Sequence, residues 1–259
     1  MRVTPIPCLK DNYAYLVTCE ESGDSIVVDP SEAAPVIAAV DAARARVVAI
    51  YNTHHHWDHV GGNEELAKKY GIKNVYGHTS DDGRIPGQTK KLDEGDKMTM
   101  GMLDVSILHI PGHTTGAIAY VVKALGESPV VFTGDTLFLG GCGRLFEGTP
   151  AMMHESLSKL AALPPETRVF CGHEYTESNL RFAAHVEPSN ADVAAAQKLA
   201  KETRGRGEPT VPGTLAHELK VNPFLRVASA EIRAKLDIAP DADAATALGA
   251  IRKAKDDFK

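Results

Sequence analysis

The first two-thirds of the chain alternates short runs of β-branched and aromatic residues with glycine, proline and aspartate. Such runs are typical of strands that are bounded by turns. We expect strands at residues 14–20, 25–30, 47–53, 74–78, 97–100, 103–110, 117–123, 129–134 and 167–172. Helices interrupt them at residues 31–43, after a serine cap, and at residues 62–71, before a C-terminal glycine. Hairpin-like strands mixed with helices predict an α/β sandwich, with sheets inside and helices outside.

The pattern changes after about residue 175, where the strand-like runs stop and helical periodicity takes over. We expect helices at residues 176–186, 190–203, 214–219 and 241–258, with a linker-like stretch at residues 204–213. A chain of 259 residues exceeds the usual size of one domain. We therefore predict two domains, an α/β domain of residues 1–174 and a smaller α-helical domain of residues 175–259.

The charge and apolar content exclude several classes of protein. The formal net charge of −6 argues against a general nucleic-acid or anionic-membrane binder, because phosphate contacts need an excess of lysine and arginine. No stretch approaches the roughly 20 apolar residues of a membrane span, and the first residues lack the apolar core of a signal peptide. The four cysteines show no CxxC spacing, which favours reduced thiols. We expect a cytoplasmic monomer with no nucleic-acid or membrane partner.

The stretch NTHHHWDHVGG places four of the eleven histidines within six positions. If the preceding strand continues into it, His54 and His56 point the same way and His55 points the opposite way. Asp58 and His59 follow after a bend, so two pairs of ligands leave one short segment, as two neighbouring cations would need. A lone histidine is usually a hydrogen-bonded or surface side chain, and a histidine run can be an expression tag. This run is internal and spaced as H-x-H-x-D-H, which favours a metal site.

Three further candidates come directly after predicted strands. They are His113 in PGHTTG, Asp135 in FTGDT and His173 in CGHEY. Loops at strand ends let a rigid sheet position several ligands together. His109 lies inside a strand run, so we interpret it as a packing residue. The remaining histidines lack the strand-then-turn setting and are expected to be ordinary: His78, His154, His185 and His217.

The series T-H-x-H-x-D-H, P-G-H-T, G-D and G-H resembles the metallo-β-lactamase superfamily over about 170 residues. The resemblance implies an αββα sandwich with a dinuclear metal site at one edge. It implies that His54, His56 and His113 hold one metal, that Asp58, His59 and His173 hold the second, and that Asp135 bridges them. Five imidazoles and two carboxylates suit zinc above all, with iron or manganese possible, since no thiolate enforces zinc. Asp29, which ends a strand, is a candidate either to support a ligand histidine or simply to start a turn.

The remaining motifs resemble the glyoxalase II (hydroxyacylglutathione hydrolase) family nearly from end to end. They are DNYAYLV, GDTLFLGGCGRLFEGT, GHEYTESNLRFAAHVEP, GEPTVPGTL, NPFLR and IRKAKDDF. The resemblance implies hydrolysis of S-D-lactoylglutathione and related 2-hydroxyacyl thioesters to a hydroxy acid and glutathione, the second step of methylglyoxal detoxification. A hydroxide that bridges the two metals would attack the thioester, with the ligands Asp58 and Asp135 as its catalytic carboxylates. A thiol leaves readily as thiolate, so no dedicated general acid is needed.

In that family a basic residue after GCG, a tyrosine after GHE and a C-terminal basic pair bind glutathione. The matching positions are Arg144, Tyr175, Arg252 and Lys255. Arg252 and Lys255 are spaced to share a helical face and pair with carboxylates; alternatively they form a solvated helix end that favours the helix dipole. Phe146 stands where the family often has a second tyrosine, so a hydroxyl contact is lost while the ring can still pack. Arg144 replaces a common lysine, which keeps the charge and changes the geometry.

Three other functions remain open at this stage. A persulfide dioxygenase of the same fold uses one iron and needs fewer ligands, which would leave His54, His59 and His173 less constrained. A nuclease is disfavoured by the acidic balance. A metal-storing or structural protein is disfavoured because structural sites are usually closed by thiolates and histidines. The seven-residue ligand set and the helical tail favour the hydrolase.

Overall fold

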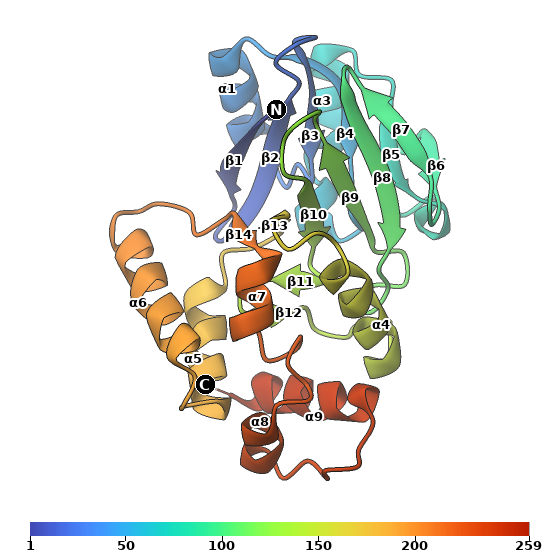
Figure 1. The fold of residues 1–259 in the computed structure, drawn as a ribbon. Coiled ribbons are helices and arrows are strands. Elements are labelled where there is room, and N and C mark those ends of the chain that lie inside the picture. The colour runs from blue at the N-terminus through green and yellow to red at the C-terminus, as the bar shows by residue number, and fades with distance from the viewer. Residues whose placement is uncertain (259) are drawn as a thin grey trace. The chain divides into compact units, whose positions relative to one another are not determined.

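The computed structural model describes residues 1–258 and divides into two compact units. The first unit comprises Met1–His109, Gly116–Gly134 and Phe170–Glu174. The second comprises Ile110–Thr115, Asp135–Val169 and the chain from Tyr175 onward. Figure 1 labels the helices and strands of both units. The units alternate along the sequence, so each collects segments that are distant in the chain.

The first unit contains a mixed six-stranded sheet in the order β1-β2-β3-β4-β5-β6. The first three strands form antiparallel pairs, whereas β3 to β6 pair in parallel. The strands are β1 (Arg2–Cys8), β2 (Asn12–Thr18), β3 (Asp24–Val28), β4 (Arg46–Tyr51), β5 (Val75–His78) and β6 (Lys90–Leu92). Parallel pairing needs crossover connections, and these carry the helices of this unit.

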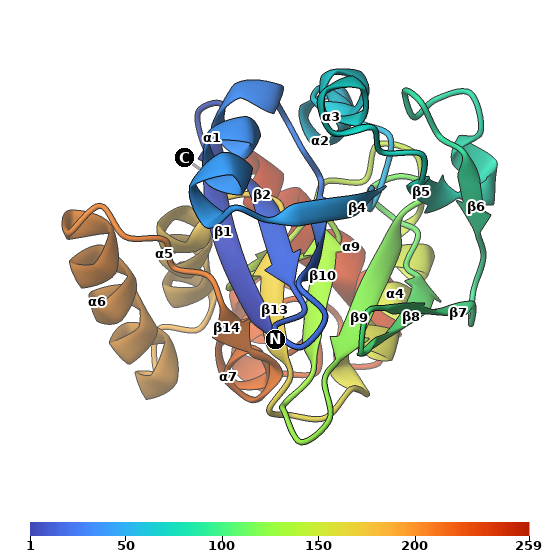
Figure 2. The ribbon, with the colours of Figure 1, turned by 90° about the horizontal axis from the view of Figure 1, so that it is seen from above.

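Two helices cover one face of this sheet, as Figure 2 shows from above. They are α1 (Ala33–Ala43) and α3 (Asn63–Tyr70), preceded by the one-turn helix α2 (Trp57–Val60); a 3₁₀ turn, η1 (Thr79–Asp81), follows β5. Val36 and Val40 of α1 and Leu66 of α3 pack in a buried cluster with valines and isoleucines of β3 and β4. As the sequence predicts, Gly71 ends α3 in the left-handed conformation. The expected serine cap of α1 is wrong, because the helix begins after Glu32 without a side-chain cap.

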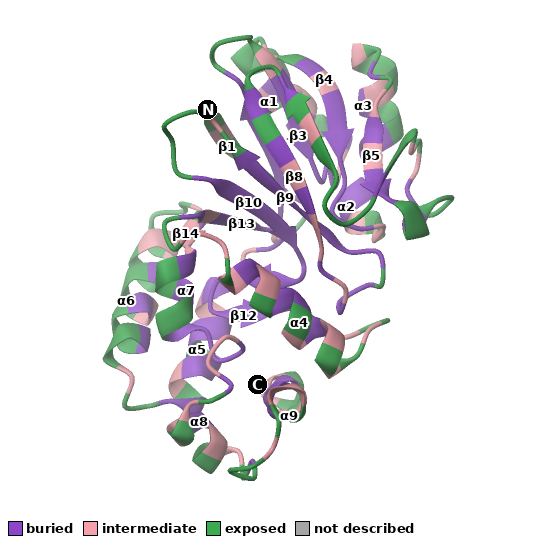
Figure 3. Cartoon of the chain, turned by 45° about the vertical axis from the view of Figure 1, so that its right-hand side comes forward, coloured by how far each residue is buried: buried purple, intermediate pink, exposed green. Residues whose placement is uncertain are grey.

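A second sheet of the first unit is antiparallel from β7 to β10, and β13 adjoins β10. These strands are β7 (Lys97–Met100), β8 (Leu103–His109), β9 (Ile118–Lys123), β10 (Val130–Gly134) and β13 (Arg168–Cys171). The sheets pack through aromatic rings: Tyr15 contacts Phe132 and Phe170, and Tyr51 stacks on Tyr120 at 4.8 Å. Figure 3 shows β9 and β10 of this sheet largely buried. The expected α/β sandwich is confirmed, and the loops that end its strands carry the candidate ligands.

The second unit is mostly helical. Its elements are β11 (Leu137–Phe138), β12 (Gly141–Cys142), α4 (Pro150–Ala161), α5 (Thr176–Val186), α6 (Ala191–Gly205), β14 (Gly213–Thr214), α7 (Leu215–Val221), α8 (Ala230–Lys235) and α9 (Ala244–Asp257). Leu180 and Ala183 of α5 pack with Val193 and Ala196 of α6 and with Val221 of α7 in a buried apolar cluster. Within residues 1–258, no helix combines the length and the apolar character that crossing a membrane requires.

Candidate metal and glutathione site

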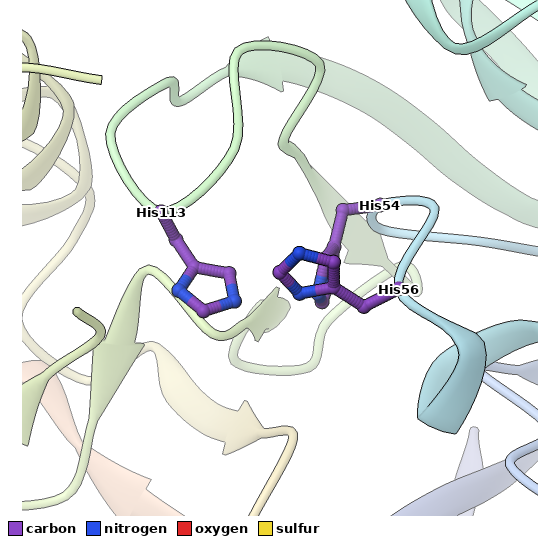
Figure 4. A group of neighbouring side chains, drawn as sticks. All are labelled: His54, His56 and His113. Carbon is purple, nitrogen blue, oxygen red and sulfur yellow. The ribbon is translucent and has the colours of Figure 1, made fainter. Parts of the chain in front are cut away.

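The loop after β4 brings His54 and His56 together. Their ring centroids lie 4.8 Å apart, and Nε2 of His54 lies 3.2 Å from Nδ1 of His56. Figure 4 draws both rings on this loop, together with that of His113 from the loop after β8. The alternation of side chains along a strand, which the sequence suggested, does not explain why these histidines point the same way. The strand β4 ends at Tyr51 and does not extend to them. An irregular loop, fixed by side-chain hydrogen bonds, sets their direction.

Asp29 at the end of β3 holds this loop. Its carboxylate accepts the Thr53 amide at 2.7 Å and the Thr53 hydroxyl at 2.6 Å, and its Oδ2 lies 3.1 Å from Nδ1 of His59. Asp29 is buried and has a φ of 47°, a left-handed conformation that is uncommon outside glycine. Such strain persists where the surroundings fix it and is common at functional sites. The supporting role considered for Asp29 therefore has a geometric basis, through both Thr53 and His59.

Asp58, His59 and His173 form a second group in the first unit. The three offer ligand atoms that all lie within 4.8 Å of one another. Oδ2 of Asp58 is 3.5 Å from Nε2 of His173 and 3.9 Å from Nε2 of His59. Asp58 and His59 lie on α2, whereas His173 follows β13, so the two sheets each contribute to the group.

Asp11, in the loop before β2, and Asn12, the first residue of β2, complete this group, and sequence reasoning did not identify either. Oδ1 of Asp11 lies 2.9 Å from Nδ1 of His173. The Asn12 amide nitrogen donates to both the backbone oxygen and Oδ2 of Asp58, each at 3.0 Å. In the sequence, the DN pair that opens DNYAYLV is the signal that could have identified these two residues. These contacts fix the ring of His173 and the carboxylate of Asp58.

His113 and Asp135 come together in the second unit. Nε2 of His113 lies 3.4 Å from Oδ2 of Asp135, and both residues are buried. Nδ1 of His113 lies 2.9 Å from the carbonyl oxygen of Arg144. Phe146 packs edge-on against the His113 ring, with centroids 5.2 Å apart. The predicted substrate-binding loop therefore contacts a predicted ligand directly.

The hydrogen bonds of these histidines suit metal ligation. Carboxylate and carbonyl oxygens only accept, so the Nδ1 atoms of His59, His113 and His173 carry the proton. The Thr53 hydroxyl donates to Asp29, so it accepts from Nδ1 of His54. In each of these four rings the lone pair is therefore on Nε2, which is the nitrogen that can bind a cation. Histidine ligands in metal sites usually have an oxygen acceptor on the other ring nitrogen, and the His and Asp groups are suited to a dinuclear metal site.

The two histidines expected to be non-ligands have other surroundings. His55 lies 3.1 Å from the buried Asp81 and contacts Arg84. His109, at the end of β8, stacks on His78 with ring centroids 4.3 Å apart. Among the described residues, neither His55 nor His109 belongs to a group of potential ligands.

A pocket of about 430 Å³ lies among basic residues of the second unit. Arg252 is 93% buried; its Nη1 donates to the Cys142 carbonyl at 2.7 Å and its Nη2 to Asp256 at 3.0 Å. Nε of Arg144 lies 3.4 Å from the same Asp256 oxygen. Nε of Arg252 is buried without a hydrogen-bond partner within residues 1–258. The pocket is lined by Arg144, Leu145, Phe146, Gly249, Arg252, Lys253 and Asp256.

Lys255 and Tyr175 lie elsewhere in the second unit. Nζ of Lys255 donates to the Ser178 hydroxyl at 3.2 Å. Burial lowers the pKa of Lys255, and the nearby charges of Arg252, Arg181 and Arg144 lower it further. The Tyr175 ring packs edge-on against Phe138. The charges of Arg252, Arg181 and Arg144 near Lys255 favour an anionic ligand in this region.

Two family models together match almost the whole chain. Residues 10–173 match the metallo-β-lactamase superfamily, and residues 174–258 match the hydroxyacylglutathione hydrolase C-terminus. A solved structure with the same fold is that of ETHE1 from Myxococcus xanthus, with a TM-score of 0.67 and 23% sequence identity. The alignment covers 98% of this chain and 97% of that one.

Curated relatives are considerably more similar. A cytoplasmic hydroxyacylglutathione hydrolase from Arabidopsis thaliana is 47% identical over 91% of this chain and 92% of its own length. A hydroxyacylglutathione hydrolase from Synechocystis sp. is 44% identical over the full length of both chains. The chain therefore belongs to the metallo-β-lactamase superfamily and, within it, to the hydroxyacylglutathione hydrolases.

Proposed function

We propose that the chain hydrolyses glutathione thioesters, with S-D-lactoylglutathione as the substrate and D-lactate and glutathione as products. The observation that carries this proposal is the set of histidines whose Nδ1 atoms are engaged by oxygen acceptors, leaving Nε2 for metals. The names of the relatives support the substrate. Arg144 and Arg252 offer the cations that a tripeptide with two carboxylates requires.

The proposed metal ligands form two sets of three with a shared carboxylate. His54, His56 and His113 would hold one cation, and Asp58, His59 and His173 the other, with Asp135 between them. Nitrogen and oxygen donors without thiolate suit zinc, and also iron or manganese. When bound, two such cations supply a hydroxide nucleophile near neutral pH, since coordination lowers the pKa of water to about 7, and they polarise the thioester carbonyl.

The protein orients the reacting groups. Asn12 donates to Asp58 and thereby holds one carboxylate oxygen in a fixed position, while Asp58 accepts or orients the proton of the nucleophile. Asp11 and Asp29 keep the rings of His173 and His59 from turning. The departing thiol has an ordinary pKa near 8.5, so it leaves as thiolate and no residue must protonate it.

Substrate recognition is assigned to the second unit. Arg144 and Arg252 would pair with carboxylates of the tripeptide, and Phe146 would pack on it. Tyr175 and Lys255 would add further contacts to the substrate. We further propose a catalytic domain of residues 1–174 and a substrate-binding domain of residues 175–259. The protein would act as a cytoplasmic monomer, without nucleic acid or membrane.

The decisive assay follows thiol release from S-D-lactoylglutathione by the metal-loaded protein, with dissolved oxygen monitored in parallel. The proposal predicts one thiol for each thioester consumed and no oxygen uptake. A persulfide dioxygenase of the same fold would instead consume oxygen with glutathione persulfide and leave the thioester intact. That result would replace the proposed function.

The shared carboxylate is tested by Asp135→Ala. The variant should lose metal and thioester hydrolysis together, because both cations would depend on it. An Asp82→Ala variant is the matched control, since this aspartate is exposed and pairs with Lys91 at the surface. Retention of two metals and normal turnover in Asp135→Ala would show that Asp135 is not the bridge.

A further inference from the structure

A turn between β11 and β12 connects the predicted metal ligand Asp135 to the pocket residue Arg144 in the chain. The turn, Phe138–Cys142, includes Gly140 with a φ of 69°, a conformation that a side chain rarely adopts. A Cβ on Gly141 would come within 2.6 Å of the Asn179 side chain. The backbone here is thus closely packed by its neighbours and has little room to move.

Three buried polar side chains bind this turn from the helices. Oε2 of Glu218 accepts the Gly140 amide at 2.8 Å. The Asn222 amide nitrogen donates to the carbonyl oxygens of Phe138 at 3.2 Å and Gly141 at 3.0 Å. The Asn179 amide nitrogen donates to the Leu139 carbonyl at 3.1 Å. Each of these three side chains is at least 95% buried.

Glu218 and Asn222 also bind one another. The Asn222 amide nitrogen lies 2.9 Å from Oε2 of Glu218, and Oδ1 of Asn222 accepts the Phe224 amide at 3.1 Å. Burying a carboxyl is costly unless it is hydrogen-bonded, and burial raises the pKa of Glu218 to about 7 despite its two donors. The apolar cluster that includes Val221 of α7 does not require a carboxyl group at position 218.

The opposite end of the turn contacts the pocket. The Cys142 carbonyl accepts from Nη1 of Arg252, and Asp256 joins Arg252 to Arg144. Hydrogen bonds to the turn, the backbone of the turn itself and the ion pairs of Asp256 therefore connect Glu218 to both guanidinium groups. A shift of the turn would move the carbonyl that holds Arg252 and the chain that carries Arg144.

We infer that Glu218 and Asn222 are positioning residues for glutathione recognition, which they serve by fixing the Phe138–Cys142 turn and thereby the two arginines of the pocket. This inference rests on the proposed function. It assigns to α7 a role in substrate affinity although neither residue lines the pocket.

The test compares Glu218→Met, which removes the acceptor at similar size, with Glu218→Gln, which keeps a neutral acceptor. KM and kcat are measured on S-D-lactoylglutathione and on a small thioester that lacks the tripeptide. We expect KM for the glutathione substrate to rise roughly tenfold in Glu218→Met, as for the loss of one buried hydrogen bond. Glu218→Gln should recover part of the affinity, and kcat should stay within about twofold of wild type.

Glu187→Gln is the matched control. Glu187 is another buried carboxylate of the second unit, and its oxygens bind Arg226 at 2.6 Å, Ser229 at 2.6 Å and Asn190 at 2.7 Å. This variant should lose stability and keep its KM. If Glu218→Met is insoluble, Glu218→Gln with Asn179→Ala carries the test, since each weakens one contact to the turn.

An unchanged KM in all soluble variants, or equal losses on both substrates, would overturn the inference. Failure of the wild type to release thiol from the glutathione substrate would instead overturn the proposed function. In that case, calorimetric binding of an S-alkyl glutathione to wild type and to Glu218→Gln still decides the positioning role. Equal dissociation constants for the two proteins, or no binding to either, would contradict it.

Discussion

Asp11 and His173 lie 162 positions apart in the sequence, yet Oδ1 of Asp11 is 2.9 Å from Nδ1 of His173. The carboxylate fixes the tautomer of the ring and leaves Nε2 facing Asp58, 3.5 Å away. An acceptor of this kind raises the basicity of the ligand nitrogen. The pair therefore links the first loop of the chain to the second proposed metal.

Replacing Asp11 with alanine should weaken the binding of one metal without altering the fold. Loss of a residue that orients a ligand typically costs about 10- to 100-fold in metal affinity. Competition with a chelator should therefore remove one of two metals from Asp11→Ala at a lower chelator concentration than from wild type. Asp82→Ala, an exposed aspartate in a surface ion pair, provides the control. Identical chelator curves for Asp11→Ala and wild type would refute this role.

His55→Gln and His109→Gln should both keep the metal content of the wild type, because among the described residues neither ring belongs to a group of potential ligands. His55→Gln should nevertheless unfold at a lower temperature, since the fully buried Asp81 would lose its contact with the His55 ring at a cost of about 1–3 kcal/mol. Metal analysis and thermal melts of the same samples separate the two effects. Loss of a full metal equivalent from either variant would contradict the non-ligand assignment.

The proposed ligands can be chosen from the sequence because most of them are close together in the chain or follow strands. The spacing around His54 and His59 is visible in seven residues, and His113, Asp135 and His173 each stand after a run of β-branched residues. The argument from strand alternation was wrong in its premise, since β4 ends before the histidines. Local periodicity does not determine where hydrogen bonds to Asp29 interrupt a strand.

The residues that orient the ligands were harder to predict, because their roles arise only from tertiary contacts. Asp11 and Asn12 are ordinary turn residues in sequence, and a helical glutamate such as Glu218 is usually exposed. Arg252 was expected to reach a substrate from an exposed helical face, whereas it is buried against the Cys142 carbonyl. Asp256, which contacts both pocket arginines, lies within the IRKAKDDF stretch, but this role arises only from tertiary contacts.

Arg144→Ala tests the pocket with the least disturbance to the fold. The Arg144 side chain is 65% exposed, so its removal leaves no buried charge unpaired. A contact to a carboxylate of the substrate should be worth on the order of 1 kcal/mol, which corresponds to about a fivefold higher KM. Added salt should raise KM of the wild type more than that of the variant, because screening acts on the missing contact. If salt raised the KM of both proteins equally, groups other than Arg144 would bind the substrate carboxylate.

The raised pKa of Glu218 predicts a specific pH dependence of stability. The folded pKa of about 7 exceeds the ordinary value of 4.5, so Glu218 favours the folded state most below pH 4.5, and this contribution is lost as the pH rises through 7. A shift of this size corresponds to about 3 kcal/mol. Glu218→Gln lacks this titration, so it should gain stability relative to wild type between pH 5 and pH 8.

Denaturant unfolding of metal-loaded wild type and Glu218→Gln at several pH values measures that difference directly. The gain in stability at pH 8 should coincide with weaker glutathione recognition, which a purely structural role for Glu218 would not produce. Parallel pH profiles for the two proteins would show that Glu218 is ionised in the fold at a normal pKa.

Activity as a function of metal added is the most direct test of a dinuclear glutathione thioesterase. Metal-free protein is titrated with Zn²⁺, and in separate series with Fe²⁺ and Mn²⁺, while thiol release from S-D-lactoylglutathione is recorded. The account predicts that activity rises until two equivalents per chain are bound and then stays constant. Full activity at one equivalent, or no thiol release at two, would contradict it.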